Sequence, residues 1–291
     1  MEKLIPQLTK VLQRIEAIFG PESVTELDGS TLAWRWLVKS GGLASGGMLE
    51  PIADPHRLTL ADLLGIDRQK TLLTRNTLQF VRGAPCNNAL LWGARGTGKS
   101  SLVKALLNEF ADDGLRLIEI DAHALIDLPH VVAPLRGRPE RFILFVYDLS
   151  FDADDSSYRT LKAALDGSVS SAPDNVVIYA TSNRRHLLPE HHSDNLDAKI
   201  VDGEIHHGEA VEEKISLSER FGIWLAFHPF SQRLYLEVVS HWLAQQGVPE
   251  LTEEAERAAL QWALLRGNRS GRVAAQFARD WAGQRAIVDE L

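Results

Sequence analysis

Five short apolar runs recur along the middle of the chain, each bounded by polar or glycine-containing stretches. Few charges interrupt these runs, as expected for strands that are covered on both faces. Segments with helical spacing lie between several of them, at 102–110, 158–165 and 211–218. The alternation predicts an α/β fold with a doubly wound, five-stranded parallel sheet. The predicted strands are 88–92, 115–120, 142–147, 176–180 and 222–227.

The N-terminal part of the chain carries a different pattern. Apolar residues recur at helical spacing between 4 and 15, and again at Ala33, Trp36 and Leu37. We therefore expect 1–39 to form an N-terminal helical segment. Four glycines and two serines within 40–47 predict a flexible linker after it.

A helical pattern also follows Pro229. Ser231, Thr252 and Ser270 are residue types that cap helix N-termini, and each precedes a segment with helical spacing. The predicted helices end near Gln246, Gly267 and Gly283 and would form a helical lid. The predicted domains are the N-terminal segment with its linker (1–50), the α/β core (51–228) and the lid (229–291).

Composition narrows the class of protein. Hydrophobic residues make up 45% of the 291 positions and charged residues 24%, which excludes a mainly disordered chain. The net charge of −8 argues against a basic coat for nucleic acid. A single cysteine, Cys86, allows neither a disulfide framework nor a cysteine-based zinc site. No apolar segment has the length of a membrane span or signal peptide, so we expect a cytoplasmic protein without a membrane partner.

The clearest chemical motif follows the first predicted strand of the core. Residues 93–100 fit the phosphate-loop pattern G-x-x-x-x-G-K-[ST], with a predicted helix directly after it. Glycines allow backbone N–H groups to surround phosphate oxygens at the helix N-terminus. The lysine can reach the β- and γ-phosphates, and the serine hydroxyl can bind Mg²⁺. The predicted nucleotide-binding residues are Gly93, Ala94, Arg95, Gly96, Thr97, Gly98, Lys99, Ser100 and Ser101.

A carboxylate for the same metal ion follows the third predicted strand. Asp148 ends this apolar strand, and an acid at that position holds Mg²⁺ beside a phosphate loop. Many ATPases have a glutamate at the next position to activate water, but this chain has Leu149. Asp148 could itself be the base, and Asp152 is another nearby acid. The sequence therefore leaves the hydrolysis rate open.

This arrangement resembles the AAA+ ATPases, and more narrowly the bacterial domain-of-unknown-function family numbered 815, predicted AAA+ ATP-binding proteins. The similarity spans about 55–280, and its most specific stretches are 148–151 (DLSF) and 216–231 (SLSERFGIWLAFHPFS). That family's pattern has two consecutive acids before Leu-Ser-Phe, whereas here Tyr147 takes the place of the first. Asp152 keeps a position that is usually acidic.

The resemblance implies further roles. Asn183, after the fourth strand, would be sensor 1, which positions water, although an asparagine can also simply cap a turn. Arg220 would be an arginine finger acting on the neighbouring subunit's ATP, which implies a ring or open-spiral homo-oligomer; the alternative is a surface ion pair. Arg272, or alternatively Arg269, would be sensor 2. Leu64 and Ile66 would line the adenine pocket or simply pack in the core.

The predicted function is ATP binding with Mg²⁺ and hydrolysis that remodels or assembles a macromolecular partner, protein or nucleic acid. The alternative is a nucleotide-dependent switch with little hydrolysis. A guanine-reading Asn-Lys-x-Asp stretch is absent from the sequence, which argues against a GTPase. The histidine pairs at 191–192 and 206–207 have no regular metal-ligand spacing. Trp34 and Trp36 could anchor a partner or dock on the core.

Overall fold

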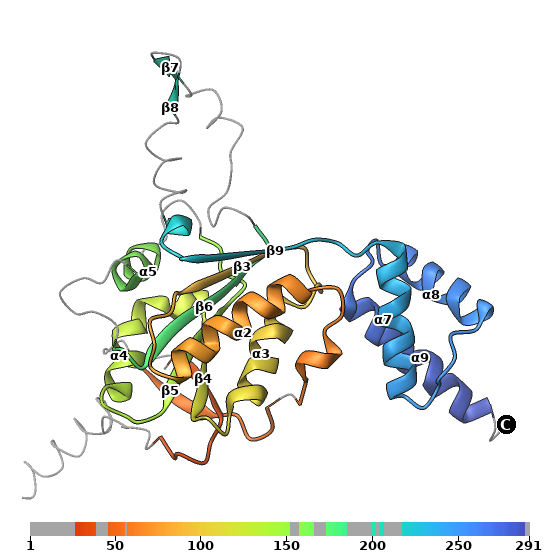
Figure 1. The fold of residues 1–291 in the computed structure, drawn as a ribbon, viewed down its shortest axis with the longest axis horizontal. Coiled ribbons are helices and arrows are strands. Elements are labelled where there is room, and N and C mark those ends of the chain that lie inside the picture. The colour runs from red at the N-terminus through yellow and green to blue at the C-terminus, as the bar shows by residue number, and fades with distance from the viewer. Residues whose placement is uncertain are drawn as a thin grey trace, which may run out of the picture.

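The computed structural model describes residues 27–38, 46–55, 57–151, 157–165, 173–184, 199–201, 204–206 and 217–288. An α/β core carries a smaller helical unit formed by the C-terminal part of the chain (Figure 1). The strands are β1 (Ala33–Val38), β2 (Gly47–Pro51), β3 (Ala89–Gly93), β4 (Leu115–Asp121), β5 (Arg141–Tyr147), β6 (Val176–Ser182), β7 (Lys199–Val201), β8 (Glu204–His206) and β9 (Ile223–Phe227). The α-helices are α2 (Asp67–Val81), α3 (Lys99–Phe110), α4 (Leu128–Val132), α5 (Ser157–Leu165), α7 (Gln232–Gln245), α8 (Glu253–Leu265) and α9 (Gly271–Val288). Short 3-10 helices are η1 (Leu60–Asp62), η2 (Ala122–Asp127) and η3 (Ala133–Leu135).

The central sheet has the order β2-β1-β4-β5-β6-β3-β9. All neighbouring strands from β1 to β9 are parallel, and only β2 is antiparallel to its neighbour. The prediction of a doubly wound parallel sheet is confirmed for the five strands of the core. Strand β3 lies between β6 and β9, whereas β4 lies three positions away across the sheet. The order of strands therefore reverses at the carboxyl end of β3, where open α/β sheets form binding crevices.

The helical prediction for Ala33, Trp36 and Leu37 is wrong, because these residues belong to β1. β1 pairs with β4 and with β2, so the sheet has seven strands rather than five. Burial of Trp34 and Trp36 on either side of exposed Arg35 is the alternation expected of a strand. The boundary predicted near residue 50 falls within β2. The helical pattern at 4–15 lies outside the described residues.

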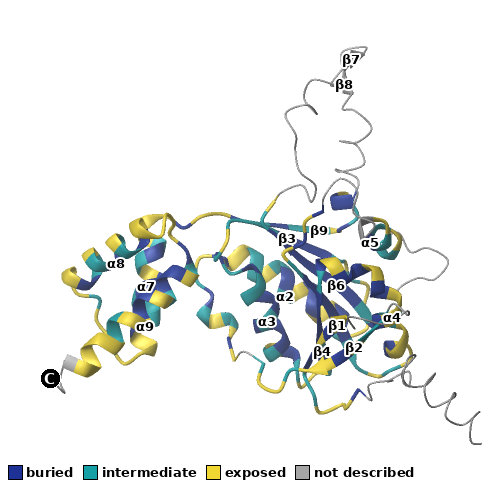
Figure 2. Cartoon of the chain, turned by 180° about the vertical axis from the view of Figure 1, so that it is seen from behind, coloured by how far each residue is buried: buried dark blue, intermediate teal, exposed yellow. Residues whose placement is uncertain are grey.

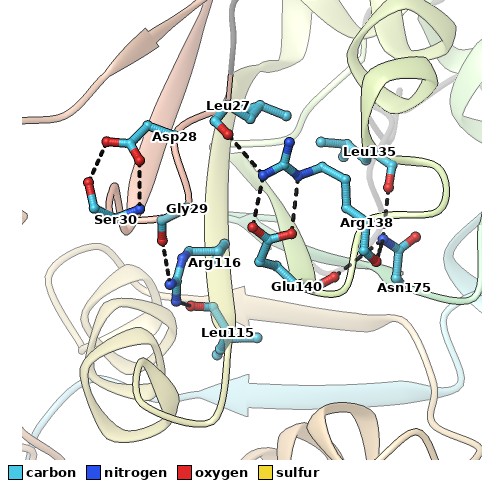
Figure 3. Close-up of polar contacts among 10 residues, drawn as sticks. All are labelled: Leu27, Asp28, Gly29, Ser30, Leu115, Arg116, Leu135, Arg138, Glu140 and Asn175. Carbon is cyan, nitrogen blue, oxygen red and sulfur yellow. Dashed lines mark hydrogen bonds and ion pairs between the residues drawn. The ribbon is translucent and has the colours of Figure 1, made fainter.

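Polar contacts fix the segment before β1 to the amino ends of the central strands (Figure 3). Arg138 donates to the Leu27 carbonyl at 2.8 Å and pairs with Glu140. Arg116 donates to the Gly29 carbonyl at 2.7 Å. Within β1, the buried Trp36 indole donates to Asp127 at 3.1 Å. Of the two roles considered for the N-terminal tryptophans, docking on the core is the one that the structure shows.

Helices cover both faces of the sheet, so the central strands are buried (Figure 2). Residues of α2 and α3 pack on one face, and residues of η2, α4 and α5 pack on the other. Helices α7, α8 and α9 form the lid around their own apolar cluster. The side chains of Ser231 and Thr252 cap α7 and α8 as predicted. Helix α9 extends to Val288, beyond the end predicted near Gly283, since a glycine within a helix is tolerated.

None of the helices in the described part of the chain combines the length and the apolar character needed to cross a bilayer. The predicted helix at 211–218 lies almost entirely outside the described residues.

Candidate functional site

The loop that joins β3 to α3 is built on glycines with backbone conformations that other residues rarely adopt. Gly93 has φ of 129°, and a Cβ there would lie 2.0 Å from the Phe227 carbonyl oxygen. Gly98 has φ of 102° and is the N-cap residue of α3. Gly96 has φ of 75°, and a Cβ there would lie 2.7 Å from Ser270 Oγ. The loop therefore presents its backbone to the space above the α3 N-terminus, where an anion is favoured.

Close contact between Gly96 and the lid leads to a testable prediction. In Gly96→Ala, the new Cβ would push Ser270 and Arg272 away from the loop, at a cost of about 1–3 kcal/mol. We expect nucleotide affinity to fall about tenfold, because about 1.4 kcal/mol corresponds to a tenfold change. Calorimetric titration with Mg·ATP measures this change.

Gly137→Ala is the matched control for this variant. Gly137 has φ of 74°, nearly that of Gly96, but a Cβ there would meet nothing within 4 Å. Both alanines carry the same backbone strain of about 1–2 kcal/mol, so only the contact with the lid distinguishes them, and Gly137→Ala should keep the nucleotide affinity of the parent protein. Equal loss of affinity in the two variants would refute a specific contact between loop and lid.

Lys99 lies beneath this loop, and its side chain is almost fully buried. Its Nζ donates to the carbonyl oxygens of Gly93 at 2.8 Å and Ala94 at 2.7 Å, and to Asn183 Oδ1 at 3.3 Å. Burial lowers the pKa of Lys99 from its usual 10.5 to about 8. The Asp148 charge opposes this shift, whereas nearby arginines reinforce it. A buried ammonium group held mainly by neutral partners is well suited to a phosphate group.

The lowered pKa of Lys99 predicts a pH dependence of nucleotide binding. Below pH 8 the free protein already carries the charge, but above pH 8 a bound polyphosphate must draw a proton onto Lys99. Affinity should therefore fall as the pH rises from 8 to 9.5. Calorimetry in two buffers of different ionisation enthalpy should show proton uptake near zero at pH 7 and approaching one proton per nucleotide at pH 9. No uptake at pH 9 would contradict the assignment.

Asp148 lies directly after β5 in a strained conformation, with φ of 52°. Its N–H donates to Thr181 Oγ1 at 3.1 Å, which joins it to the end of β6. Asn183 Nδ2 donates to Asp148 Oδ1, and Arg95 lies 4.0 Å from the other carboxylate oxygen. Asn183 thus contacts both Lys99 and Asp148. The structure brings together the predicted lysine, acid and sensor asparagine.

The residues on either side of Asp148 differ in their surroundings. Leu149, where many ATPases have glutamate, is fully buried in the core on the α4 and α5 face. Tyr147 lines the cleft on the other face, and its hydroxyl donates to Asp121 Oδ2 at 3.0 Å. Burial and this hydrogen bond raise the pKa of Tyr147. Asp148 is therefore the acid that the end of β5 directs toward the cleft.

A cavity of about 830 Å³ lies between the core and the lid. Its walls come from the β3–α3 loop, the segment at 58–66, the end of β5 and the helices α7 and α9. Twelve residues predicted from the sequence line it: Leu64, Ile66, Arg95, Gly96, Thr97, Gly98, Lys99, Ser100, Ser101, Asp148, Asn183 and Arg272. Gly93 and Ala94 do not line the cavity, but their carbonyls hold Lys99.

Sequence reasoning missed several residues of the cavity wall. Arg279 lies two turns after Arg272 on α9. Trp242 on α7 and Gln246, the residue that caps the end of α7, follow Val238 at spacings of four. This spacing was the available signal, but it shows only that the residues share a helix face. Asp62, Lys104 and Phe230 also line the cavity and were not predicted.

The lid is joined to the core by direct contacts around this cavity. The Arg272 N–H donates to the Gly96 carbonyl at 3.3 Å, and His241 Nε2 lies 3.2 Å from Asp62 Oδ1. Of the two lid arginines considered, Arg272 lines the cavity and Arg269 does not. The position of the lid therefore determines the shape of the site.

One predicted catalytic residue does not line this cavity, and another is not described. Arg220 precedes β9 and is absent from the cavity wall. Asp152 lies outside the described residues, as do three members of the histidine pairs, and the side chain of the fourth, His206, is not described. Among the residues described, no group of three or more His, Cys, Asp or Glu could hold a metal ion. Burial raises the pKa of the Cys86 thiol, as expected for an unreactive cysteine.

Comparison with known proteins identifies the family of this chain and shows which solved structures share its fold. A family model described as "Protein of unknown function (DUF815)" matches residues 31–285, which includes β1 and β2. Heat shock protein 100 of Trypanosoma brucei brucei is 28% identical over 144 residues, 48% of this chain but only 16% of that protein.

Two solved structures show the same architecture. A point mutant of Thermotoga maritima RuvB has a TM-score of 0.54 at 15% identity, over 80% of this chain and 67% of that one. The Aeropyrum pernix Orc1 protein in complex with DNA has a TM-score of 0.52 at 16% identity, over 77% and 62%. RuvB and Orc1 are AAA+ P-loop ATPases, so the fold is of the AAA+ type.

Proposed function

The chain belongs to the DUF815 family, and on that premise we propose that it binds ATP with Mg²⁺ in the cleft between core and lid. One observation carries the proposal: the buried Lys99 ammonium lies under a glycine loop that faces an 830 Å³ cavity. Loop N–H groups, the α3 N-terminus and Lys99 together suit a polyphosphate.

The charge and polarity of the cavity wall support the same ligand. Five cationic and two anionic side chains line the cavity, although the chain as a whole has a net charge of −8. The cations are Arg95, Lys99, Lys104, Arg272 and Arg279, and the anions are Asp62 and Asp148. Leu64, Ile66, Phe230 and Trp242 add apolar surface suited to a nucleotide base.

The residues at the α3 N-terminus fit a magnesium ion. Ser100 offers a hydroxyl and Asp148 a carboxylate, which are the oxygen ligands that Mg²⁺ prefers. Together with phosphate oxygens they would hold the ion, which when bound neutralises negative charge on the phosphates. Lys99 would exchange the loop carbonyls for phosphate oxygens.

For hydrolysis, we propose that Asp148 and Asn183 orient the attacking water, since their side chains are hydrogen-bonded at the cleft. Arg220 would act on ATP held by the neighbouring subunit of a homo-oligomer, because it does not line its own cavity. Turnover would rearrange the oligomer or a bound macromolecular partner.

A switch with little hydrolysis is the second candidate. Leu149 favours this candidate, because it stands where many ATPases have the water-activating glutamate and its side chain is buried in the core. Asp148 is also already engaged by Asn183 and lies near Arg95.

Light scattering with and without Mg·ATP, combined with phosphate release, separates the two candidates. Assembly with sustained phosphate release supports the ATPase, and assembly without release supports the switch. A protein that stays monomeric and releases phosphate would overturn the role of Arg220 in a neighbouring subunit.

A further inference from the structure

The carboxyl ends of β4 and β5 carry a hydrogen-bonded pair that the proposed function does not use. Tyr147 and Asp121 are register partners on these adjacent parallel strands, and the phenol donates to Asp121 Oδ2 at 3.0 Å. We propose that this pair positions the water shell of the nucleotide-bound Mg²⁺, an inference that rests on the proposed function. The phenol oxygen would accept from a metal-bound water while its proton points to Asp121.

The direction of the two strand-end side chains supports this role. Tyr147 packs with the apolar cluster on the α3 face and lines the cavity, as does Ser100 at the α3 N-terminus. Asp148 turns through its left-handed backbone toward Asn183 and Arg95. The side of the cleft next to α3 is therefore occupied by Tyr147, and the side next to β6 by Asp148.

Charge compensation distinguishes Asp121 from the other acid on this face of β4. Glu119 is buried and pairs with Lys104 at 3.2 Å and with Arg35 at 2.9 Å. Asp121 accepts from two neutral donors, the Tyr147 hydroxyl and the His123 backbone N–H. Asp121 itself does not line the cavity, so its negative charge acts on the cleft through the phenol. A carboxylate that hydrogen-bonds to the groups around a metal ion, without contacting the ion, orients those groups.

Tyr147→Phe tests the pair, because it keeps the ring packing and removes only the hydroxyl. Binding of a fluorescent ATP analogue is titrated with Mg²⁺, and separately measured in EDTA. We expect the apparent Mg²⁺ affinity to fall about tenfold, the lower end of the effect of such residues, with binding in EDTA unchanged. Asp121→Asn keeps one oxygen for the His123 N–H but turns an amide donor toward the phenol, which can then no longer donate there, so it should show a loss in the same direction.

Tyr179→Phe provides the control. It also removes a phenol hydroxyl from the same sheet, one that is hydrogen-bonded to Asn76 and Thr77 and does not line the cavity. Its Mg²⁺ dependence should equal that of the parent protein. Parent-like Mg²⁺ affinity in Tyr147→Phe, or an equal loss in EDTA, would overturn this inference alone. No nucleotide binding by the parent protein would overturn the proposed function as well.

Discussion

Replacing Lys99 with alanine is expected to weaken Mg·ATP binding at least 100-fold. Hydrogen bonds to a charged group contribute about 1.5–3 kcal/mol each, and about 2.8 kcal/mol corresponds to 100-fold. Lys99 is the cation most deeply buried under the phosphate loop, with three oxygen acceptors around Nζ. Calorimetric titration of the parent protein and of Lys99→Ala measures the difference.

The alanine variant should fold at least as well as the parent protein without nucleotide. The lowered pKa of Lys99 shows that folding disfavours its charged form, so removing the side chain takes away a buried charge. Lys162→Ala, on α5 at the opposite face of the sheet, is the control and should bind like the parent. Parent-like affinity in Lys99→Ala would refute the phosphate site.

Replacing Arg220 with alanine is expected to lower kcat about 1,000-fold while the affinity for ATP stays within a few-fold. An arginine supplied to a transferring phosphoryl group contributes about 10³–10⁵ in rate. Because Arg220 does not line its own cavity, its loss should leave the binding site intact. Steady-state phosphate release and calorimetry measure the two quantities on the same protein.

Mixing the two inactive variants tests whether Arg220 acts between subunits. A subunit with Arg220→Ala still has a complete binding site, and a Lys99→Ala neighbour still supplies Arg220. The mixture should therefore regain turnover that neither variant shows alone. No recovery in mixed oligomers, or full turnover by Arg220→Ala alone, would contradict the assignment.

The five core strands and the lid helices could be predicted because their signals are local. Apolar runs, capping residues and a glycine loop are all read within a few positions. β1 was not predicted, because Ala33, Trp36 and Leu37 also fit helical spacing. The segment forms a strand because it pairs with β4. Such pairing joins residues far apart in the sequence.

Helix α2 was not predicted, for a different physical reason. Its buried positions 73, 76, 77 and 80 have helical spacing, but two of them are Asn76 and Thr77. These polar residues can be buried because both hydrogen-bond to the hydroxyl of Tyr179 on strand β6. Their partner cannot be found from the local pattern.

The candidate site could be predicted mainly on the side of the core, and Arg272 is the predicted lid residue that lines the cavity. Residues of the phosphate loop were evident from their motif, and residues 95–101 of it line one cavity. Trp242, Gln246 and Arg279 enter the wall because of how α7 and α9 lie against the core. Burial of Leu149 on the opposite face likewise depends on the packing of α4 and α5.

A crystal structure with Mg²⁺ and a non-hydrolysable ATP analogue would show directly whether the cleft between core and lid binds the nucleotide. We expect phosphates at the N–H groups of residues 96–100, Lys99 Nζ moved from the loop carbonyls onto phosphate, and Arg272 facing the nucleotide from the lid. A nucleotide bound elsewhere, or a cavity that stays empty at saturating analogue with Lys99 still on Gly93 and Ala94, would contradict this expectation.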